Sequence, residues 1–369
     1  MGRLKTIKLT LLHVSFNLFY QACYHLGRRQ PQQITFASMR SAKLTDNLQA
    51  LYTEFDRANT SNLKTLCFHY DHSFKSKIGF LLASLRALNA IAKSQLFIVD
   101  DYYFPLYALN KHSKNQVVQL WHAIGTLKKF GLSLPHADQS VMKPHTNYDW
   151  VFINADVDRP AYANAFEVDP SHILATGEPM MDQLMRQRPE PHAGAKRLLY
   201  SPTYRQGSNG EQRVIAYVKS FVQATQQLTD DWEIYISLHP YLQLPQLELP
   251  ANVHIFQDAT RVKTIMSTID LFVTDYSSLS LNFSYFDRPI LLWTPDYQDY
   301  LKTSGFYVDY YQYLGAPYFK SVSTLMTFVN QQLPTLDLGY VHTLKAKTFP
   351  HQDGRNSERV YKFLKQKIG

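Results

Sequence analysis

Several widespread sequence signatures are absent from this chain of 369 residues. It contains two cysteines, Cys23 and Cys67, whose spacing fits neither a disulfide framework nor a structural zinc site, so a reducing, cytoplasmic setting is favoured. The absence of a G-x-G-x-x-G fingerprint and of a Walker loop argues against a dehydrogenase or an NTPase, and no G-x-S-x-G elbow is present. The acidic pair Asp100–Asp101 has no second acidic cluster, and a turn at a strand end explains it equally well, so we expect no metal.

The sequence is rich in apolar and aromatic residues and in positive charge. Hydrophobic residues make up 45% and aromatic residues 14% of the chain, which is enough for a large core. A length of 369 residues suits two domains of ordinary size. The net charge of +8 and the pI near 9.2 favour anionic partners, namely nucleic acid, nucleotides or a membrane surface that carries acidic lipids.

The N-terminal segment, residues 1–29, has basic ends and an apolar middle but lacks the small-residue cleavage site of a signal peptide. Polar residues interrupt the apolar run at every fourth position and would form one stripe on a helix; they are His13, Asn17, Gln21 and His25. That stripe argues against a helix surrounded by lipid. Two interpretations remain: an amphipathic helix that lies on a membrane surface, or a helix that packs on the body of the protein.

Apolar, β-rich runs alternate with helical patterns along the chain. Strands are predicted at residues 63–70, 94–100, 116–122, 149–155 and 172–177, and then at 197–203, 232–240, 252–258, 269–275 and 288–293. Helices are expected within 80–93, 214–228 and 278–286. Several strands are continuously apolar, as strands covered on both faces must be, so we predict an α/β fold of two doubly wound, Rossmann-like domains that face a cleft. A charged, proline-containing stretch at 185–197 is the predicted linker.

Polar and basic residues follow several predicted strands at the carboxyl end, where ligands of doubly wound sheets bind. The stretch "LWHAIGTLKKFG" supplies His122, Lys128 and Lys129, and "YSPTYRQG" supplies Thr203 and Arg205. His239 lies in "ISLHP", and Asp275, Ser277 and Ser278 lie in "VTDYSSLSLNF". We place a fifth stretch in the same group, "QDGRNSERV", with Asp353, Arg355 and Ser357 at the start of a final helix.

The turn after the predicted strand at 269–275 has two interpretations. Asp275 or a following serine can cap the next helix by accepting hydrogen bonds from its first free N–H groups. The same helix start can bind an anion, because the free N–H groups and the positive end of the helix dipole face outward. The hydroxyls of Ser277 and Ser278 would add two donors to phosphate oxygens.

His122 and His239 occupy matching positions at strand ends in the two predicted domains. Either histidine alone is more often a surface or core residue than a catalytic one. Facing one cleft from two sheets, the pair could serve as a general base and as a donor to phosphate. Lys128, Lys129 and Arg205 could neutralise a nucleotide diphosphate or a lipid diphosphate, although charge runs are more often solvated surface.

In these stretches the chain resembles the CDP-glycerol glycerophosphotransferases of teichoic acid biosynthesis, over most of residues 95–365. The ordered set "LWHAIGTLKKFG", "YSPTYRQG", "SLHP", "VTDYSSLSLNFSYFDRPIL" and "FPHQDGRNSERV" carries the resemblance. It implies a B-type glycosyltransferase architecture, with an acceptor-binding domain at 30–190, a nucleotide-binding domain at 191–345 and a C-terminal helix at 346–369 that crosses back. Ser237-Leu238 departs from the Arg-Pro that many members have, which removes one expected cation from the cleft.

The resemblance implies transfer of glycerol phosphate from CDP-glycerol to a hydroxyl of a lipid-diphosphate-linked disaccharide, with release of CMP, in wall teichoic acid synthesis. The chain looks like the short, primase type because it lacks the long extra N-terminal region of the polymerases. His122 is then the candidate base, and Lys128 or Lys129 would meet the diphosphate of the acceptor. The donor diphosphate would be bound by His239, Thr203, Arg205, Asp275, Ser277 and Ser278, with no cofactor or metal.

We therefore expect a peripheral enzyme of a Gram-positive cell, at the cytoplasmic face of the membrane. Its expected partners are CDP-glycerol, the lipid-linked acceptor and the membrane surface, and not nucleic acid, because no aromatic-plus-basic module is present. Three alternatives stay open: a glycerol- or ribitol-phosphate polymerase, a sugar-nucleotide glycosyltransferase, and a non-enzymatic basic protein that binds membranes.

Overall fold

A computed structural model describes residues 3–27, 32–68, 74–134, 142–189, 193–205, 207, 209–239, 242 and 248–368. The chain divides into two compact units. The first comprises Met1–Gln183 together with Pro350–Gly369, and the second comprises Leu184–Phe349. Each unit has its own parallel sheet and is described separately below.

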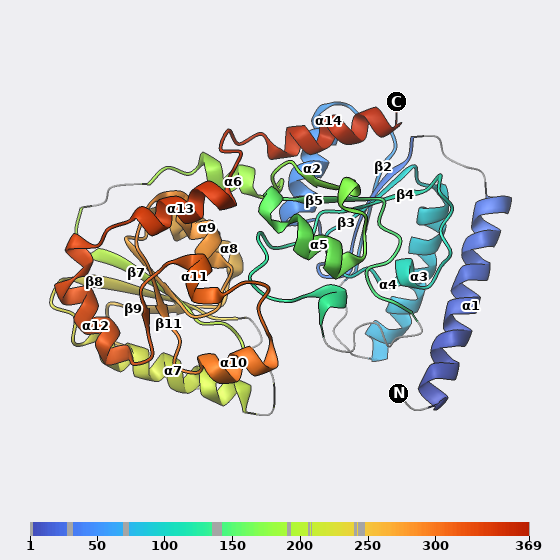
Figure 1. Cartoon of the computed structure of the whole chain (residues 1–369). Helices are drawn as coiled ribbons and strands as arrows, with labels where there is room; N and C mark the ends of the chain where they lie inside the picture. The colour runs from blue at the N-terminus through green and yellow to red at the C-terminus, as the bar shows by residue number, and fades with distance from the viewer. Residues whose placement is uncertain are drawn as a thin grey trace. The chain divides into compact units, whose positions relative to one another are not determined.

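The sheet of the first unit has six parallel strands in the order β2-β1-β3-β4-β5-β6 (Figure 1). The strands are β1 (Ile34–Ser38), β2 (Leu63–Cys67), β3 (Leu96–Val99), β4 (Gln116–Gln119), β5 (Trp150–Ile153) and β6 (Ile173–Ala175). Every residue of β1 and β3 is buried, as the continuous apolar runs of a doubly covered sheet require. This sheet confirms the predicted α/β class for the first half of the chain.

Helices cover both faces of this sheet. They are α1 (Arg3–Leu26), α2 (Asp46–Arg57), α3 (Phe74–Lys93), α4 (Phe104–Tyr107), α5 (Arg159–Phe166) and α14 (Asn356–Ile368), with 3₁₀ turns η1 (Gly131–Ser133), η3 (Asp156–Asp158) and η4 (Pro170–His172). One core joins residues of α1, α3, α4 and α5 to the sheet, and the other joins α2 and α14. Helix α6 (Met181–Arg186) carries the chain into the second unit.

Helix α1 packs along α3 and places one of its faces in the first core (Figure 1). Phe16 and Tyr20 are buried there, and the Tyr20 hydroxyl donates to Oδ1 of Asn115 over 2.8 Å. The second interpretation of residues 1–29, packing on the protein body, therefore holds for this face of the helix. None of the helices in the described ranges has the length and apolar character needed to cross a bilayer.

The sheet of the second unit is also parallel and six-stranded, in the order β12-β11-β10-β7-β8-β9 (Figure 1). Its strands are β7 (Lys196–Ser201), β8 (Trp232–Ser237), β9 (Val253–Phe256), β10 (Leu271–Thr274), β11 (Ile290–Trp293) and β12 (Tyr318–Phe319). In chain order these strands follow the 3-2-1-4-5-6 arrangement of dinucleotide-binding folds. The predicted pair of Rossmann-like sheets is thereby confirmed.

The helices of the second unit pack against this sheet. They are α7 (Gly210–Thr225), α8 (Ala259–Ile265), α9 (Leu279–Phe283), α10 (Tyr297–Thr303), α11 (Tyr310–Leu314), α12 (Val322–Gln331) and α13 (Gly339–Thr348), with turns η5 (Met266–Thr268), η6 (Ser284–Phe286) and η7 (Leu333–Thr335). Apolar residues of α7 and α12 share one core with the strands; Phe221 and Leu325, for example, are fully buried.

The last helix, α14, belongs to the first unit, and a buried carboxylate holds its start. Asp182 accepts hydrogen bonds from the backbone N–H groups of Asn356 (2.7 Å) and Ser357 (2.8 Å). The ring of Tyr361 meets Phe55 of α2 edge-on, with centroids 4.8 Å apart. Our grouping of "QDGRNSERV" with the strand ends is wrong, because this stretch follows α13 and begins α14.

Two strands escaped the sequence analysis, and several predicted strands are too long. The pattern does not predict β1 or β12, which have five and two residues. Predicted strand 116–122 ends at Gln119, because Trp121 has a φ of 55° and cannot continue an extended ladder. Predicted strand 232–240 ends at Ser237. The final helix begins at Asn356 rather than at residue 346.

Candidate active site

Each sheet has a switch point, where the strand order reverses and the loops that follow two neighbouring strands diverge. It lies between β1 and β3 in the first sheet and between β7 and β10 in the second. Asp100 and Asp101 follow β3, whereas Thr203 and Asp275 follow β7 and β10. Ligands of doubly wound sheets bind at such points, so the polar residues of these loops are the candidate site of each unit.

His122 pairs with a carboxylate of the neighbouring strand end. Its Nδ1 lies 3.6 Å from Oδ1 of Asp101, since β3 and β4 end side by side at the register pair Val99 and Gln119. Nδ1 is buried and accepts or donates no hydrogen bond within the described part of the chain. Contacts of catalytic groups are often long without substrate and tighten when it binds. With its Nδ1 proton directed at Asp101, the imidazole would keep Nε2 free to accept a proton.

Burial lowers the pKa of His122 below its usual value, and the nearby Asp101 carboxylate acts in the opposite direction. The imidazole is therefore neutral at pH 7, the state that a general base requires. The acidic pair that the sequence suggests for a turn thus includes the partner of His122. In the sequence, the Asp-Asp pair at the end of the strand beside "QLWH" is the feature that could have indicated Asp101 as this partner.

The other member of that pair, Asp100, links the loops after β1 and β3. Its Oδ1 accepts from the Ser38 hydroxyl over 3.0 Å, and its Oδ2 lies 3.5 Å from Nη2 of Arg40. Burial raises the pKa of Asp100 to about 6. Asp100 therefore fixes the switch point of the first unit, while Asp101 faces the imidazole.

The two lysines that follow His122 leave the strand end in a loop held by buried contacts. Lys129 is exposed and Lys128 is half-buried. Just before them, the Thr126 hydroxyl donates to Oδ1 of the buried Asp158 over 2.7 Å. Burial raises the pKa of Asp158 to about 6. The loop thus has a fixed base and carries its cations at the surface.

In the second unit, Thr203 and Arg205 meet Asp275 at the switch point. Both carboxylate oxygens of Asp275 accept from the backbone N–H of Thr203, at 2.8 and 3.0 Å. Nη2 of Arg205 lies 2.9 Å from Oδ2 of the same carboxylate. The structure therefore brings these three predicted residues together.

Arg205 is buried and has a second carboxylate partner, Asp296, which follows β11. Its Nε and Nη2 donate to the two Asp296 oxygens over 2.8 and 2.9 Å, and its Nη1 donates to the Thr203 carbonyl. The guanidinium lies 4.9 Å from the ring centres of both Tyr276 and Tyr300. All three guanidinium nitrogens are thus engaged within the protein, and the predicted contact of Arg205 with a diphosphate stays a prediction.

The two serines lie beside this cluster, where a short helix begins. Ser278 directly precedes α9, and the Ser277 hydroxyl accepts from the backbone N–H of Leu279 over 3.2 Å. The capping interpretation therefore describes Ser277. Both side chains are half-buried, and their contact with an anion stays a prediction.

His239 follows β8, the strand next to β7, and a large part of its surface is exposed. Its ring centre lies 5.4 Å from that of Tyr204, the neighbour of Arg205. Partial burial lowers the pKa of His239, so a neutral imidazole is favoured at pH 7. The predicted meeting of His122 and His239 in one pocket stays a prediction, because the two residues belong to different units.

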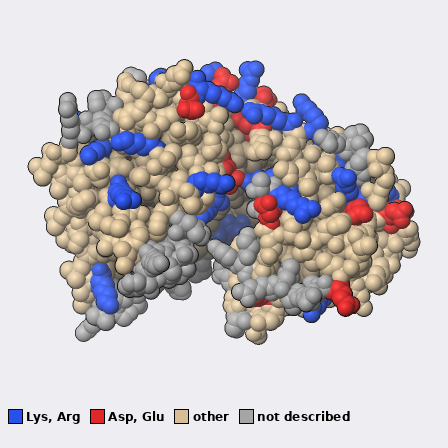
Figure 2. Space-filling view, turned by 180° about the vertical axis from the view of Figure 1, so that it is seen from behind, with Lys and Arg blue, Asp and Glu red and all other residues tan. Residues whose placement is uncertain are grey.

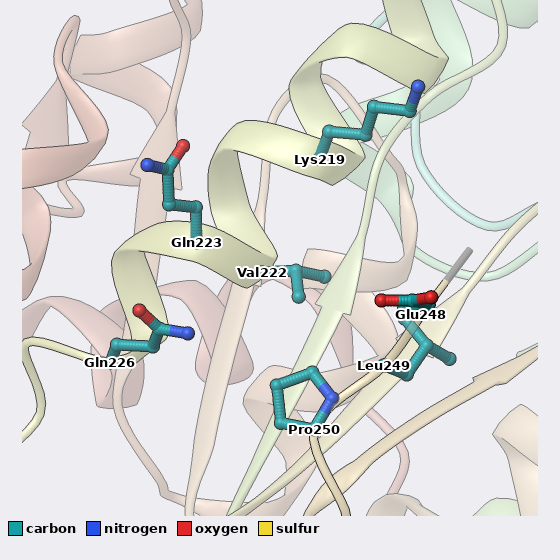
Figure 3. A pocket seen from close by; sticks show the side chains of 7 residues that line it. All are labelled: Lys219, Val222, Gln223, Gln226, Glu248, Leu249 and Pro250. Atoms are coloured by element: carbon teal, nitrogen blue, oxygen red, sulfur yellow. The ribbon is translucent and has the colours of Figure 1, made fainter.

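A pocket in the second unit lies apart from these loops. A pocket of about 410 Å³ lies between the second half of α7 and residues 248–250, which precede β9 (Figure 3). Its lining comprises Lys219, Val222, Gln223, Gln226, Glu248, Leu249 and Pro250. It thus borders the amino end of β9, whereas the candidate residues follow carboxyl ends. No group of three or more potential metal ligands occurs among the residues described.

Basic residues form no single surface on the face that Figure 2 shows. Lys and Arg side chains lie there in several separate groups, some of them beside Asp and Glu side chains. A nucleic-acid-binding protein usually gathers its cations in one patch or stripe. The expectation that nucleic acid is not a partner stays a prediction.

Comparison with known proteins identifies the family to which these sheets and loops belong. The model of the family described as CDP-Glycerol:Poly(glycerophosphate) glycerophosphotransferase matches residues 18–366. The chain belongs to this family. The match confirms the resemblance that the ordered motifs predict.

Curated relatives of this family member span nearly its whole length. A teichoic acid ribitol-phosphate primase of Bacillus spizizenii is 29% identical, with 98% of each chain covered. A teichoic acid glycerol-phosphate primase of Bacillus subtilis is 23% identical, with 87% of this chain and 90% of the relative covered.

Solved structures support the fold of the glycerophosphotransferase family member. The wall teichoic acid polymerase TagF resembles it with a TM-score of 0.73 at 17% identity, covering 100% of this chain and 98% of that chain. A UDP-GlcNAc 2-epimerase from Neisseria meningitidis resembles it with a TM-score of 0.56 at 12% identity, covering 91% of this chain and 100% of that one. These likenesses agree with two Rossmann-like sheets.

Proposed function

We propose that the protein transfers a polyol phosphate, glycerol phosphate in the first instance, from its CDP ester to a hydroxyl of a lipid-linked disaccharide, as a teichoic acid primase. The observation that carries this proposal is the His122 imidazole 3.6 Å from the Asp101 carboxylate, at the strand ends of a chain that belongs to the glycerophosphotransferase family. The donor class comes from the family description, and the primase type from relatives of matching length.

In the proposed reaction, the acceptor oxygen attacks the phosphorus that carries the glycerol. The acceptor proton passes to Nε2 of His122 as the new P–O bond forms. The bond between this phosphorus and the bridging oxygen breaks, and CMP leaves with the electron pair. Asp101 stabilises the imidazolium while it exists, because a carboxylate near a histidine favours its charged form. Lys128 or Lys129 would meet the diphosphate of the acceptor lipid.

The second unit would hold the donor. His239, Ser277 and Ser278 would donate to the diphosphate at the ends of β8 and β10. Thr203 and Asp275 would form the wall of this site, and Arg205 would hold its loops through two carboxylates and add positive potential. Charge stabilisation and positioning then supply most of the acceleration, with no cofactor or metal in the scheme.

Ribitol phosphate is the second candidate for the transferred group. The B. spizizenii relative named for ribitol phosphate is 29% identical, whereas the B. subtilis relative named for glycerol phosphate is 23% identical. The described contacts of the donor loops contain no feature that distinguishes three carbons from five. CDP-glycerol, CDP-ribitol and a UDP-sugar should therefore be offered in parallel.

The test measures CMP release from each donor with a soluble analogue of the lipid-linked disaccharide. CMP formation from CDP-glycerol that requires the acceptor is the expected result, and His122→Ala should reduce turnover by ~10²–10⁴-fold with little change in nucleotide affinity. If CMP is released only from CDP-ribitol, the donor of the proposed reaction is CDP-ribitol and not CDP-glycerol. Transfer from the UDP-sugar alone would make the protein a glycosyltransferase and refute the proposal.

We also propose that the protein binds the cytoplasmic face of the membrane peripherally, through the outer face of α1. Ile7, Leu11, Val14 and Leu18 recur at helical spacing and are 56, 63, 48 and 64% exposed, on a helix whose other face is packed. Helix α3, on which α1 packs, also has exposed apolar side chains: Ile78, Leu81 and Leu82. The exposed Lys8 lies between apolar residues, and the whole chain carries a net charge of +8, which suits acidic headgroups.

A further inference from the structure

A buried glutamine joins the ends of β3 and β4, which carry the proposed dyad of Asp101 and His122. Gln119 is the last residue of β4, pairs in register with Val99 and is fully buried. Its Nε2 donates to the Asp101 carbonyl over 3.2 Å, and its Oε1 accepts from the Trp121 backbone N–H over 2.9 Å. The Gln119 amide thus links Asp101 to Trp121, the residue that precedes His122.

The backbone at Trp121, which donates to this amide, needs such support. Trp121 has a φ of 55°, a left-handed conformation that bulky residues rarely adopt. This bend turns the chain out of β4 and directs His122 toward Asp101. Residues in sparsely populated conformations persist only where surrounding contacts hold them.

Contacts with Asn47 and Phe130 also support the bend at Trp121. Nδ2 of Asn47, from α2, donates to the carbonyls of Leu120 (3.1 Å) and Trp121 (3.0 Å). The Trp121 ring lies against Phe130, with ring centres 5.1 Å apart. The Gln119 amide bonds both to this bend and to the loop of Asp101.

We propose that Gln119 is a positioning residue, which fixes His122 against Asp101 by holding both strand ends with one amide. The inference rests on the proposed function, in which His122 is the base. It predicts that loss of this amide changes the environment of His122 before it changes substrate binding. Gln119 itself touches no substrate in this scheme.

The test uses the full chain with ¹⁵N-labelled histidine, the variant Gln119→Met and NMR titration of the imidazole nitrogens. The His122 signals are assigned by their absence from His122→Ala. Methionine keeps the length of the side chain but provides no donor and only a weak acceptor. The His122 titration of Gln119→Met should move to higher pH, because a released loop admits water and removes part of the burial that lowers its pKa. Turnover should fall by ~10- to 100-fold, and the KM for CDP-glycerol should stay within about twofold.

Gln33→Met is the matched control. Gln33 is 1% exposed and donates to Thr35 (3.1 Å) and Ser94 (2.9 Å), but it precedes β1 at the opposite end of the sheet. This variant loses a similar pair of buried hydrogen bonds. Its His122 titration and turnover per folded molecule should match those of the wild type.

A second variant keeps the test decisive if Gln119→Met does not fold. A protonated glutamic acid at this position has both a donor and an acceptor, whereas its carboxylate has only acceptors. Gln119→Glu should therefore show the wild-type His122 signals at low pH and depart from them as pH rises. A His122 titration that stays at its wild-type position in Gln119→Met and in Gln119→Glu at every pH would overturn the proposal.

The same measurements separate this inference from the proposed function. If His122→Ala keeps wild-type turnover, His122 is not the base, yet the NMR titration still reports whether Gln119 positions it. If Gln119→Met loses turnover while His122 titrates as in the wild type, the loss has another origin and Gln119 is not a positioning residue. A shifted titration with reduced turnover supports both.

Discussion

At the scale of single residues, the candidate base depends on two neighbouring residues and on its burial. Asp101 supplies a negative charge 3.6 Å from Nδ1 of His122, Trp121 supplies the bend, and burial supplies the low pKa. Burial and Asp101 act in opposite directions on that pKa. Their separate contributions can therefore be read from the pH dependence of turnover.

We expect Asp101→Asn to lower turnover by ~10- to 100-fold and to move the acidic limb of the turnover profile to lower pH. The carboxylate raises the pKa of His122, so its removal leaves burial to lower that pKa further, and the base stays deprotonated to lower pH. A pH–rate profile from pH 5 to 9 measures both effects. Asp156→Asn, which affects an exposed ion pair with Arg159, should behave as the wild type. A limb that moves upward in Asp101→Asn would contradict the dyad.

The guanidinium nitrogens of Arg205 are engaged by groups inside the protein. Arg205 is 5% exposed and is paired with both Asp275 and Asp296. We expect Arg205→Ala to lower the free energy of unfolding of the second unit by ~3–5 kcal/mol, because two buried carboxylates lose their cation. Urea denaturation followed by tyrosine fluorescence measures this loss.

The control for that measurement is Arg213→Ala. Arg213 is 43% exposed at its side chain and lies 3.8 Å from Asp296, so its loss should cost less than about 1 kcal/mol. Equal losses in the two variants would show that Arg205 does not hold the loops. A normal stability of Arg205→Ala with a large loss of CMP affinity would instead support the ligand contact predicted from the sequence.

At the scale of elements, the buried residue Glu178, which follows β6, contacts α2 through its carboxyl group and α14 through its backbone carbonyl. Oε2 of Glu178 accepts from Nδ2 of Asn47, and the Glu178 carbonyl accepts from Nδ2 of Asn356. Burial raises the pKa of Glu178 to about 8. An acid whose pKa is higher in the folded than in the unfolded state binds more protons when folded, so its contribution to stability falls as pH rises from about 4.5 to about 8.

We expect Glu178→Gln to remove this part of the pH dependence. Its amide oxygen can keep the bond from Asn47, and it carries no charge that burial would penalise. Relative to the wild type, the variant should gain roughly 2 kcal/mol or more between pH 5 and pH 8.5. Thermal melting across that range measures the gain. Parallel pH curves for the two proteins would mean that Glu178 does not titrate on folding.

Helix α1 gives a second prediction at this scale, since its outer face is the proposed membrane contact. Replacing Leu11 and Leu18 with aspartate should abolish binding to vesicles that contain acidic lipid, because charge enters an exposed apolar stripe while the packed face is untouched. Co-sedimentation at low and high salt measures binding. Val157→Asp, at a residue that is 52% exposed in η3, is the control. Unchanged binding of the double variant would exclude α1 as the contact.

The sequence predicts elements well where burial on both faces produces a continuous apolar run, as in β3 and β10. It misses β12, which has two residues, and it misses the end of β4, where the bend depends on Asn47 of the distant helix α2 and on the side chain of Gln119. The sequence predicts His122 as a site residue because it lies at the end of a predicted strand. Asp296 does not, because only the folded sheet brings it to Arg205 from 91 residues away.

At the scale of the whole molecule, the sequence predicts that histidines of both units serve one donor molecule. His122 belongs to the first unit and His239 to the second. A nucleotide held by the second unit alone would perturb only histidines of that unit. A nucleotide shared by both would perturb one in each.

We expect CMP or CDP-glycerol to shift the ¹⁵N signals of both His122 and His239 in the labelled full chain. His239 should respond because its ring follows β8 beside the donor loops, and His122 because its imidazole would approach the transferred phosphorus. His172 and His342, on turn η4 and helix α13, are the controls and should stay unchanged. The two active-site signals should saturate at the same nucleotide concentration, since one binding event would cause both shifts. A response of His239 without His122, at saturating CDP-glycerol and with acceptor analogue present, would leave the first unit without a role in the transfer step and remove His122 as its base.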